Sequence, residues 1–286
     1  MLTPSERITL ITEVARRLST EDWPVMDLTL RQFGQPVDDG WRGEKHPYVI
    51  AMIDRAEDAA LVGLASHLGY DVRNPSTLTP SFWEADRFKL FITHLAAHKG
   101  EAADLQSALG AYGVSAFVAH RDIEPTKEWQ DEIELALNTC DALVVLLHTG
   151  FHDSKWVDQE IGFAMGRALL IVSVRYGEDP YGFIGRYQGL QGLGRSAPQV
   201  AADLVEIFAS NKQTSARMAE ALVAFFASSD TFSEAKSRVT LLDKIPVWNL
   251  GLLERLRASL QSNDQISHAY GVPERVRTII STRGAG

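Results

Sequence analysis

The sequence predicts an α/β fold in which a parallel sheet is preceded and followed by helical segments. Strand-like and helix-like stretches alternate from residue 87 to about residue 200, which is typical of βαβ units in an open sheet. One strand-like stretch, residues 142–147, is wholly apolar, as expected for a strand that is buried on both faces. The two flanks instead carry apolar residues at helical spacing.

The first segment, residues 1–81, is predicted to be a helical domain with a role in assembly or sensing. Its first helix begins at the N-cap Thr3, with a proline at the first helical position and Glu6 three residues after the cap. A second long stretch of apolar residues at helical spacing covers residues 49–68. Residues 74–81, Asn-Pro-Ser-Thr-Leu-Thr-Pro-Ser, are predicted to be a linker.

The middle segment, residues 87–210, is the predicted sheet domain. We expect strands at residues 88–92, 115–118, 143–147 and 169–174, helices at residues 102–112, 129–140 and 201–210, and a further helix that begins near residue 154. Open sheets of this kind bind ligands beyond the carboxyl ends of their strands. The loops that follow the strands are therefore the first place to look for a site.

The last segment, residues 212–286, is again predicted to be helical. Leu253, Leu256 and Leu260 share one face of a predicted helix. Their repeat is much shorter than the three or four heptads that characterise a coiled coil, so we interpret these leucines as core residues. A second helix is expected after Pro273.

The composition argues against several classes of function. A net charge of −9 over 286 residues makes a nucleic-acid partner unexpected. The single cysteine, Cys140, cannot form a disulfide framework and suits a reducing compartment. No apolar run approaches the roughly 20 residues that span a bilayer, so no membrane association is expected. These features together predict a cytoplasmic protein.

The most informative stretch is residues 151–160, Phe-His-Asp-Ser-Lys-Trp-Val-Asp-Gln-Glu, which directly follows the apolar strand. Asp153 and Ser154 are candidates to cap the helix that begins there. Trp156 and Glu160 stand at positions i and i+4 of this helix, so they share one face. An aromatic ring and a carboxylate are therefore expected together at the carboxyl end of the sheet.

Three motifs occur in order along the middle segment. They are residues 91–94 (Phe-Ile-Thr-His), residues 119–125 (Ala-His-Arg-Asp-Ile-Glu-Pro) and residues 154–160. With these motifs, residues 87 to about 200 resemble a TIR domain, the Toll/interleukin-1 receptor-like module, in its bacterial form. The third motif is similar to the family pattern Ser-x-Trp-Cys-x-x-Glu, with Val157 in place of the cysteine. The second motif lacks the glycine that commonly follows the proline in this family.

The resemblance implies a flavodoxin-like sheet and, as in many bacterial members, cleavage of NAD⁺ at the bond between nicotinamide and ribose. Glu160 would be the catalytic residue, and NAD⁺ would be the substrate rather than a cofactor. The products would be nicotinamide and either ADP-ribose or a cyclic isomer. The family also implies a homo-oligomer that is activated by assembly, through a protein or small-molecule trigger, in bacterial antiphage or stress defence.

One carboxylate is chemically sufficient for this reaction, because nicotinamide leaves NAD⁺ as a neutral molecule. Ordinary glycosidases need a second carboxyl group to protonate an alkoxide leaving group. Here a single carboxylate can stabilise the positive charge that develops at the anomeric carbon. Trp156 would stack on a flat ring or pack beside the ribose. Backbone N–H groups of the helix that begins near Glu101 would contact the pyrophosphate, with help from Arg121 or Lys127. The candidate substrate-binding residues are Trp156, Thr93, His94, Leu95, Arg121, Asp153 and Ser154.

Two alternatives to an NAD⁺ hydrolase stay open. The chain can be a non-enzymatic signalling scaffold that acts by homotypic assembly, because other members of the family have lost catalysis. It can also resemble a nucleoside deoxyribosyltransferase, which uses a glutamate on a related sheet. Turnover of NAD⁺ and activity on deoxynucleosides distinguish the three functions.

Two further signals are weaker. Histidines gather at or after the strand ends, but loop positions rarely provide the spacing of metal ligands, so no metal is expected. These histidines are His94, His98, His120, His148 and His152. Residues 192–197 match the letters of a dinucleotide-binding fingerprint, but no strand is predicted before them and Pro198 follows.

Overall fold

The computed structural model describes residues 2, 4–68, 82–118 and 127–283. Contacts between residues divide the chain into two compact units, residues 1–78 and residues 79–286. The predicted linker at residues 74–81 and the predicted loop at residues 119–125 lie outside the described residues. Within the described part of the chain, no helix combines the length and the apolar character that crossing a membrane requires.

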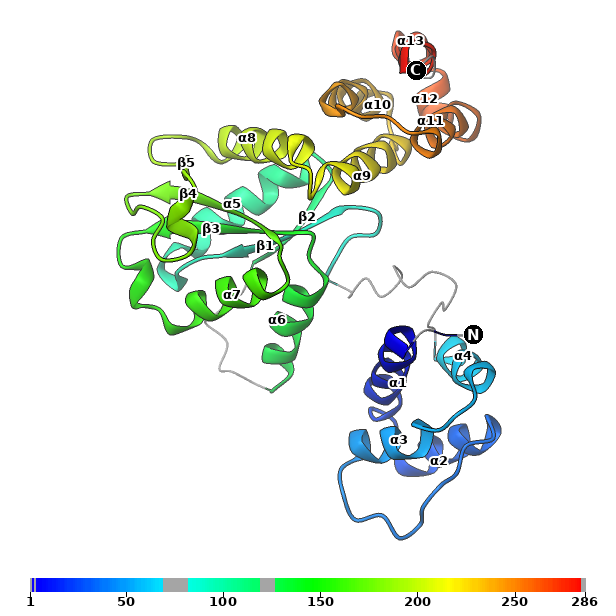
Figure 1. The fold of residues 1–286 in the computed structure, drawn as a ribbon. Coiled ribbons are helices and arrows are strands. Elements are labelled where there is room, and N and C mark those ends of the chain that lie inside the picture. Colours follow the sequence, from blue (N-terminus) through cyan, green and yellow to red (C-terminus); the bar gives the residue numbers. More distant parts are fainter. Residues whose placement is uncertain (1, 3, 69–81, 119–126, 284–286) are drawn as a thin grey trace. The chain divides into compact units, whose positions relative to one another are not determined.

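The first unit has four helices in its described residues (Figure 1). They are α1 (Pro4–Leu18), α2 (Trp23–Gln32), α3 (Lys45–Ile53) and α4 (Asp58–His67). α1 contacts α3 and α4 through buried residues at helical spacing, among them Val14 and Leu18. Tyr48 is also buried, and its hydroxyl donates a hydrogen bond of 2.7 Å to Oδ1 of Asp27. The unit therefore has a hydrophobic core of its own.

The sequence predicts one helical stretch over residues 49–68, but the structure has two helices there. α3 ends at Ile53 and α4 begins at Asp58. Ile53 and Ala56 are buried in the core of the unit, so apolar packing holds the turn between the helices. No glycine or proline marks this turn, which is why the local sequence does not reveal it. The sequence prediction also lacks α2, although an aspartate and a proline mark its start.

The second unit is built on a parallel sheet with five strands in its described residues. The strands are β1 (Phe88–Thr93), β2 (Val114–Val118), β3 (Ala142–His148), β4 (Leu170–Tyr176) and β5 (Leu190–Gln191). Their order across the sheet is β2-β1-β3-β4-β5, and all neighbours are parallel. This is the flavodoxin-like order, so the predicted fold class is confirmed. Every residue of β3 is buried, as its apolar run predicts.

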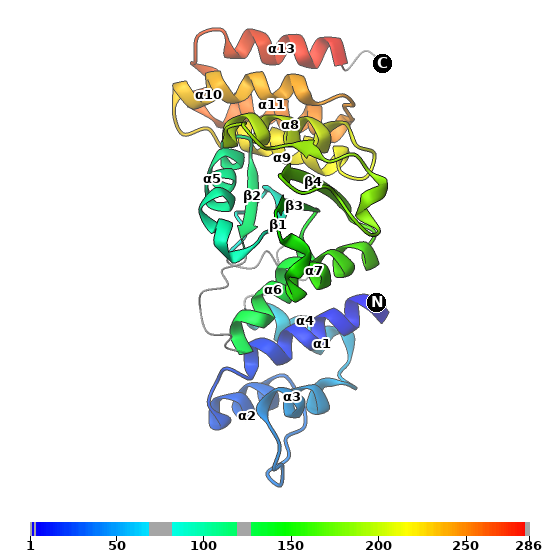
Figure 2. The ribbon, with the colours of Figure 1, turned by 90° about the vertical axis from the view of Figure 1, so that its left-hand side faces the viewer.

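Helices cover both faces of this sheet (Figure 2). α5 (Lys99–Gly110), α8 (Ala197–Ser210) and α9 (Ser215–Ala227) lie on one face, and α6 (Lys127–Thr139) and α7 (Lys155–Gly166) lie on the other. Because side chains alternate along a strand, each face has its own buried cluster. We call the face that carries Leu90, Val144 and Leu146 the α5 face, and the face that carries Phe91, Leu143 and Val145 the α7 face.

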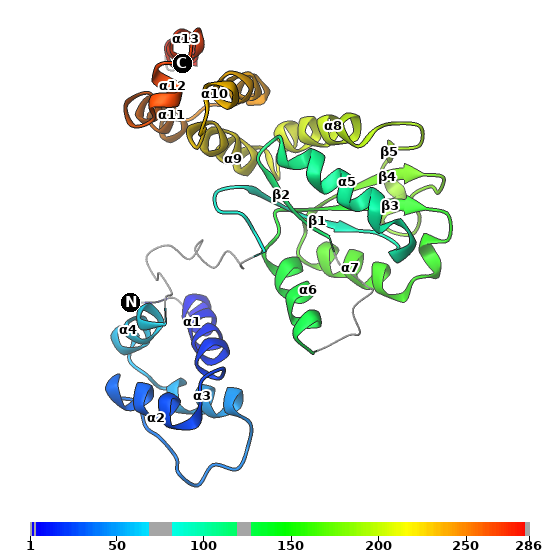
Figure 3. The same cartoon turned by 180° about the vertical axis from the view of Figure 1, so that it is seen from behind.

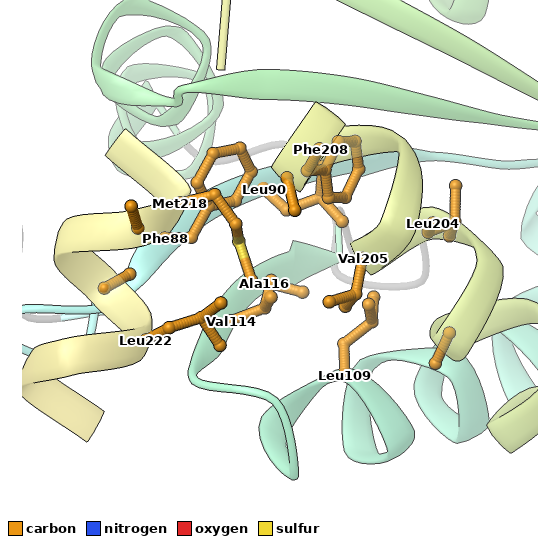
Figure 4. Close-up of a cluster of buried hydrophobic side chains, with 14 of the residues drawn as sticks. Phe88, Leu90, Leu109, Val114, Ala116, Leu204, Val205, Phe208, Met218 and Leu222 are labelled. Atoms are coloured by element: carbon orange, nitrogen blue, oxygen red, sulfur yellow. The ribbon is translucent and has the colours of Figure 1, made fainter. Parts of the chain in front are cut away.

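The core of the α5 face joins the sheet to the helices that follow it (Figure 4). The ring of Phe88 on β1 stacks on that of Phe208 on α8, with centroids 5.0 Å apart. Met218 and Leu222 of α9 belong to the same cluster of buried side chains. α9 contacts both β1 and the last helices of the chain. It therefore connects the sheet with the C-terminal segment.

The C-terminal segment adds its helices to this cluster (Figure 3). They are α10 (Phe232–Arg238), the 3-10 helix η5 (Val239–Lys244), α11 (Leu250–Ser262), α12 (Asp264–Ser267) and α13 (Val272–Arg283). Leu253 and Leu256 are buried, and Leu260 packs against the cluster. Their interpretation as core residues is therefore confirmed. Asn249 caps α11, since its side chain accepts a hydrogen bond of 2.9 Å from the backbone N–H of Leu252.

A substitution in the turn between α5 and β2 tests how closely α9 packs on this part of the structure. Gly113 has a φ of +72°, and a Cβ added there would lie 2.9 Å from Cβ of Phe225 on α9. Gly113→Ala is expected to lower the free energy of unfolding by about 2–4 kcal/mol, because it combines left-handed strain with a steric clash. Urea unfolding followed by circular dichroism measures this.

The matched control for this prediction is Gly110→Ala, three residues earlier. A Cβ at Gly110 meets no atom within 4 Å, and Gly110 is the last residue of α5. Alanine there is expected to be neutral or to stabilise the helix by up to about 1 kcal/mol. Equal unfolding midpoints for the two variants would contradict the close packing of α9 on this turn.

Candidate functional site

The strand order places a crevice at the carboxyl ends of β1 and β3. The chain connections from these two neighbouring strands lead to opposite sides of the sheet, so the residues that follow them flank a gap. β1 ends at Thr93 and β3 ends at His148. Side chains at this edge point either to the α5 face or to the α7 face, because neighbouring residues on a strand alternate.

Glu160 lies in the second turn of α7, and only 5% of its surface is exposed. α7 contacts β1, β3 and β4, and its apolar side includes Val157 and Ile161 in the buried cluster of the α7 face. Glu160 directly precedes Ile161, so it lies at the margin of this apolar side. Removing a carboxylate from water costs free energy. A buried carboxylate on the helix that follows β3 is therefore a candidate for a functional group.

Thr93 faces the same side of the sheet as α7. It pairs in register with Val145, whose side chain belongs to the buried cluster of the α7 face. Thr93 is 0% exposed, and its Oγ1 has no hydrogen-bond partner among the described residues. An unsatisfied buried hydroxyl costs about 1–3 kcal/mol. Thr93 therefore presents an unused hydrogen-bonding group on the side of the crevice that carries Glu160.

The other predicted site residues lie at several depths. Trp156, in the first turn of α7, is 38% exposed, and Leu95 packs against the cluster of the α7 face. Asp153 is exposed at the end of the 3-10 helix η3 (Phe151–Asp153). Ser154 occupies the N-cap position of α7, but its side chain makes no capping hydrogen bond. Arg121 lies outside the described residues.

The loop before α7 is anchored by a buried ring. Gly150 has a φ of +83°, a conformation that glycine adopts without strain, and Phe151 is fully buried in the cluster of the α7 face. After β4 the hydroxyl of Tyr181 donates a hydrogen bond of 2.6 Å to Oδ1 of Asp158. Burial and this hydrogen bond raise the pKa of Tyr181, so the hydroxyl keeps its proton. These contacts fix the start of α7, and with it the position of Glu160.

A second polar cluster lies at the same edge of the sheet, on the α5 face. His148 pairs in register with Tyr176, and their rings stack with centroids 4.7 Å apart at 7°. The ring of His98 stacks on the other side of His148, with centroids 3.5 Å apart at 5°. Glu101, in the first turn of α5, places Oε1 3.5 Å from Nδ1 of His98 and Oε2 3.1 Å from Nε2 of His148. We call these four residues the histidine column.

Burial shifts the pKa values of His148 and Tyr176. It lowers the pKa of His148, the nearby His98 and His94 lower it further, and Glu101 opposes the shift only in part. The imidazole of His148 is therefore neutral at pH 7. Burial also raises the pKa of Tyr176. His94 thus influences the pKa of His148 in the histidine column, whereas its neighbour Thr93 faces α7.

The single cysteine lacks the properties of a nucleophile. Cys140 lies two residues before the start of β3, at the end of the sheet opposite the crevice. Burial raises the pKa of its thiol to about 11, so the thiolate is not populated at neutral pH. Among the described residues, the groups that can act at the crevice are therefore carboxylates, histidines and hydroxyls.

The glycine-rich stretch at residues 192–197 allows the backbone to pack closely against side chains of β4. A two-residue strand, β5, precedes it, which the sequence did not predict. A Cβ at Gly192 would lie 2.7 Å from side-chain atoms of Tyr176 and Val174. Glycine is required here because the backbone crosses these side chains closely. The expectation that no strand precedes this stretch is therefore wrong, but the close packing at Gly192 still argues against a dinucleotide fingerprint.

Comparison with known families agrees with this geometry. Residues 90–205 match the family model of the TIR domain. The chain contains a TIR domain. The match runs from β1 into α8, so the first unit and the C-terminal helices are additions to this domain. Among curated proteins, no match to the chain is found.

None of the four residues of the histidine column was predicted from sequence as a site residue, although His98 and His148 were noted among the histidines near the strand ends. Glu101 and His98 are three residues apart at the start of the helix that follows β1, and Tyr176 ends the strand next to β3. The sequence showed histidines near strand ends, which was the available signal. It could not show that rings from η2 (Ala96–His98), β3 and β4 stack on one another, because stacking depends on the packing of α5 against the sheet.

Thr93→Val tests whether the buried hydroxyl is unpartnered. Valine keeps the shape of threonine but has no hydroxyl, so the free energy of unfolding is expected to rise by about 1 kcal/mol. Thr93→Ala, which also removes a methyl group, is expected to be less stable than Thr93→Val. Thermal unfolding of the three proteins measures this. Destabilisation of Thr93→Val relative to wild type would show that the hydroxyl has a partner in the folded protein.

Proposed function

We propose that the protein is an NAD⁺ glycohydrolase in which Glu160 is the catalytic residue. The observation that carries this proposal is the buried carboxylate of Glu160, held on α7 beside the crevice of a TIR domain. The substrate bond is the one between nicotinamide and ribose. A bacterial antiphage or stress response is the setting that we propose for this activity.

The chemistry requires little from the protein beyond one carboxylate. As the C–N bond breaks, nicotinamide keeps the bonding electron pair and leaves as a neutral molecule. The Glu160 carboxylate stabilises the positive charge that remains on the ribose. Water then attacks the anomeric carbon and releases a proton, which gives ADP-ribose. If a nitrogen of the adenine attacks instead, the product is a cyclic isomer.

The remaining candidates have supporting roles in this proposal. Trp156 presents its ring one helical turn before Glu160, where it can stack on the nicotinamide or pack on the ribose. The hydroxyl of Thr93 can donate a hydrogen bond to a ribose oxygen. Asp153 and Ser154 border the entrance, at the start of α7. A pyrophosphate contact from Arg121 stays a prediction.

The burial of the site supports gating by assembly. Glu160 is 5% exposed and Thr93 is 0% exposed in the single chain, so NAD⁺ cannot reach them without a rearrangement. TIR domains have the potential for homotypic assembly. We propose that contact with a second copy moves the loops around the crevice and opens the site. The isolated chain is then an inactive form.

Glu160→Gln tests the proposal because glutamine keeps the size of the side chain and removes its charge. Release of nicotinamide from NAD⁺ is expected to fall by at least about 100-fold. It is measured for wild type and variant over a series of protein concentrations, with the oligomeric state recorded by light scattering. Wild-type activity per chain is expected to rise with concentration.

Two variants make this result specific. Glu220→Gln removes an exposed carboxylate on α9, which pairs only at the surface with Arg217, and full activity is expected. Thr93→Val is expected to lower activity while leaving the fold intact. If wild-type oligomers release no nicotinamide, the enzyme proposal fails and a signalling scaffold is the remaining function.

A further inference from the structure

We infer that His98, Glu101 and His148 form a binding site for a divalent transition-metal ion, with Zn²⁺ as its natural occupant. One ligand atom from each of the three residues lies within 4.8 Å of the others. Two imidazoles and one carboxylate are a donor set that Zn²⁺ uses in proteins, with a fourth position open to water or a ligand. This site goes beyond the proposed hydrolysis of NAD⁺.

The distances between the ligand atoms suit one shared ion. Zn²⁺ binds nitrogen and oxygen at about 2.0–2.1 Å, so two ligands of a tetrahedral site lie about 3.4 Å apart. Oε1 of Glu101 lies 3.5 Å from Nδ1 of His98, and Oε2 of Glu101 lies 3.1 Å from Nε2 of His148. Each imidazole nitrogen is therefore about as far from one oxygen of this carboxylate as two ligands of one ion are from each other.

His148 supports this inference independently of those distances. Its side chain is 6% exposed, and its Nε2 has no hydrogen-bond partner among the described residues. Oε2 of Glu101 is only 3.1 Å away, but this contact does not have the geometry of a hydrogen bond. This is also the arrangement of two ligands that share one ion, because their lone pairs point at the ion and not at each other. A metal ion would satisfy this buried nitrogen without moving the strand.

The three ligand side chains differ in how far they can move. His148 ends β3, and the ring of Tyr176 covers one side of its imidazole. Glu101 belongs to the first turn of α5. The side chains of His98 and Glu101 are 32% and 51% exposed, so an ion can enter from solvent. The site thus has one rigid buried ligand and two that can adjust.

Binding requires one movement. Parallel rings 3.5 Å apart cannot both direct a nitrogen at the same ion, so the ring of His98 must tilt out of the stack. Its partial exposure leaves room for this rotation. The bound ion would then tie η2 and the start of α5 to the end of β3. This connection lies on the α5 face, whereas Glu160 belongs to the α7 face.

Metal binding by the full-length protein tests this inference. Purified protein is treated with EDTA, desalted, and titrated with Zn²⁺ against a chromogenic chelator. Co²⁺ is added in a parallel experiment, because tetrahedral Co²⁺ absorbs visible light. Wild type is expected to bind one ion per chain. His98→Ala and Glu101→Gln are each expected to weaken binding by at least about tenfold, and circular dichroism verifies that both variants fold.

Matched controls separate this site from adventitious binding and from the NAD⁺ proposal. His268→Ala removes an exposed histidine that lies 4.0 Å from the carboxylate of Asp264, and it should bind metal like wild type. Glu160→Gln should also bind metal like wild type, whether or not NAD⁺ is cleaved. The inference is overturned if wild type binds no ion in the titration, or if the double variant His98→Ala/Glu101→Gln binds as tightly as wild type.

Discussion

The parallel pairing of β1 with β3 is the constraint on which the candidate site depends. β3 is buried along its whole length, so it can only be the inner strand of a sheet that helices cover on both faces. The register that pairs Thr93 with Val145 then determines where each side chain at the carboxyl edge points. A shift of one residue would turn Thr93 away from α7 and His148 away from α5.

This alternation produces two chemically different clusters a few residues apart in sequence. The α7 face carries Thr93 and the buried carboxylate of Glu160, which suit a reaction that develops positive charge. The α5 face carries the histidine column, whose donors suit a metal ion. Both clusters lie at the carboxyl edge of the same sheet, but on opposite faces, so the backbone of β1 and β3 separates them. Each can therefore be altered by substitutions that leave the other intact.

The parts that the sequence predicted are those with strong local signals. The apolar run of β3 and the motif that ends in Glu160 placed the sheet and the candidate catalytic residue. The break between α3 and α4 was not predicted, because packing of Ile53 and Ala56 replaces the usual glycine or proline. The role of Tyr176 was not predicted either, since its stacking on His148 joins side chains from two strands. Local patterns do not contain such contacts.

The central claim is that NAD⁺ binds on the α7 face with its nicotinamide ribose at Glu160. A crystal structure of the full-length protein with a carba-NAD⁺ analogue, which cannot be hydrolysed, tests this most directly. We predict that the carboxylate of Glu160 lies within about 3.2 Å of a hydroxyl of that ribose. A nucleotide bound on the α5 face, with Glu160 still covered by α7 and the sheet, would contradict the account.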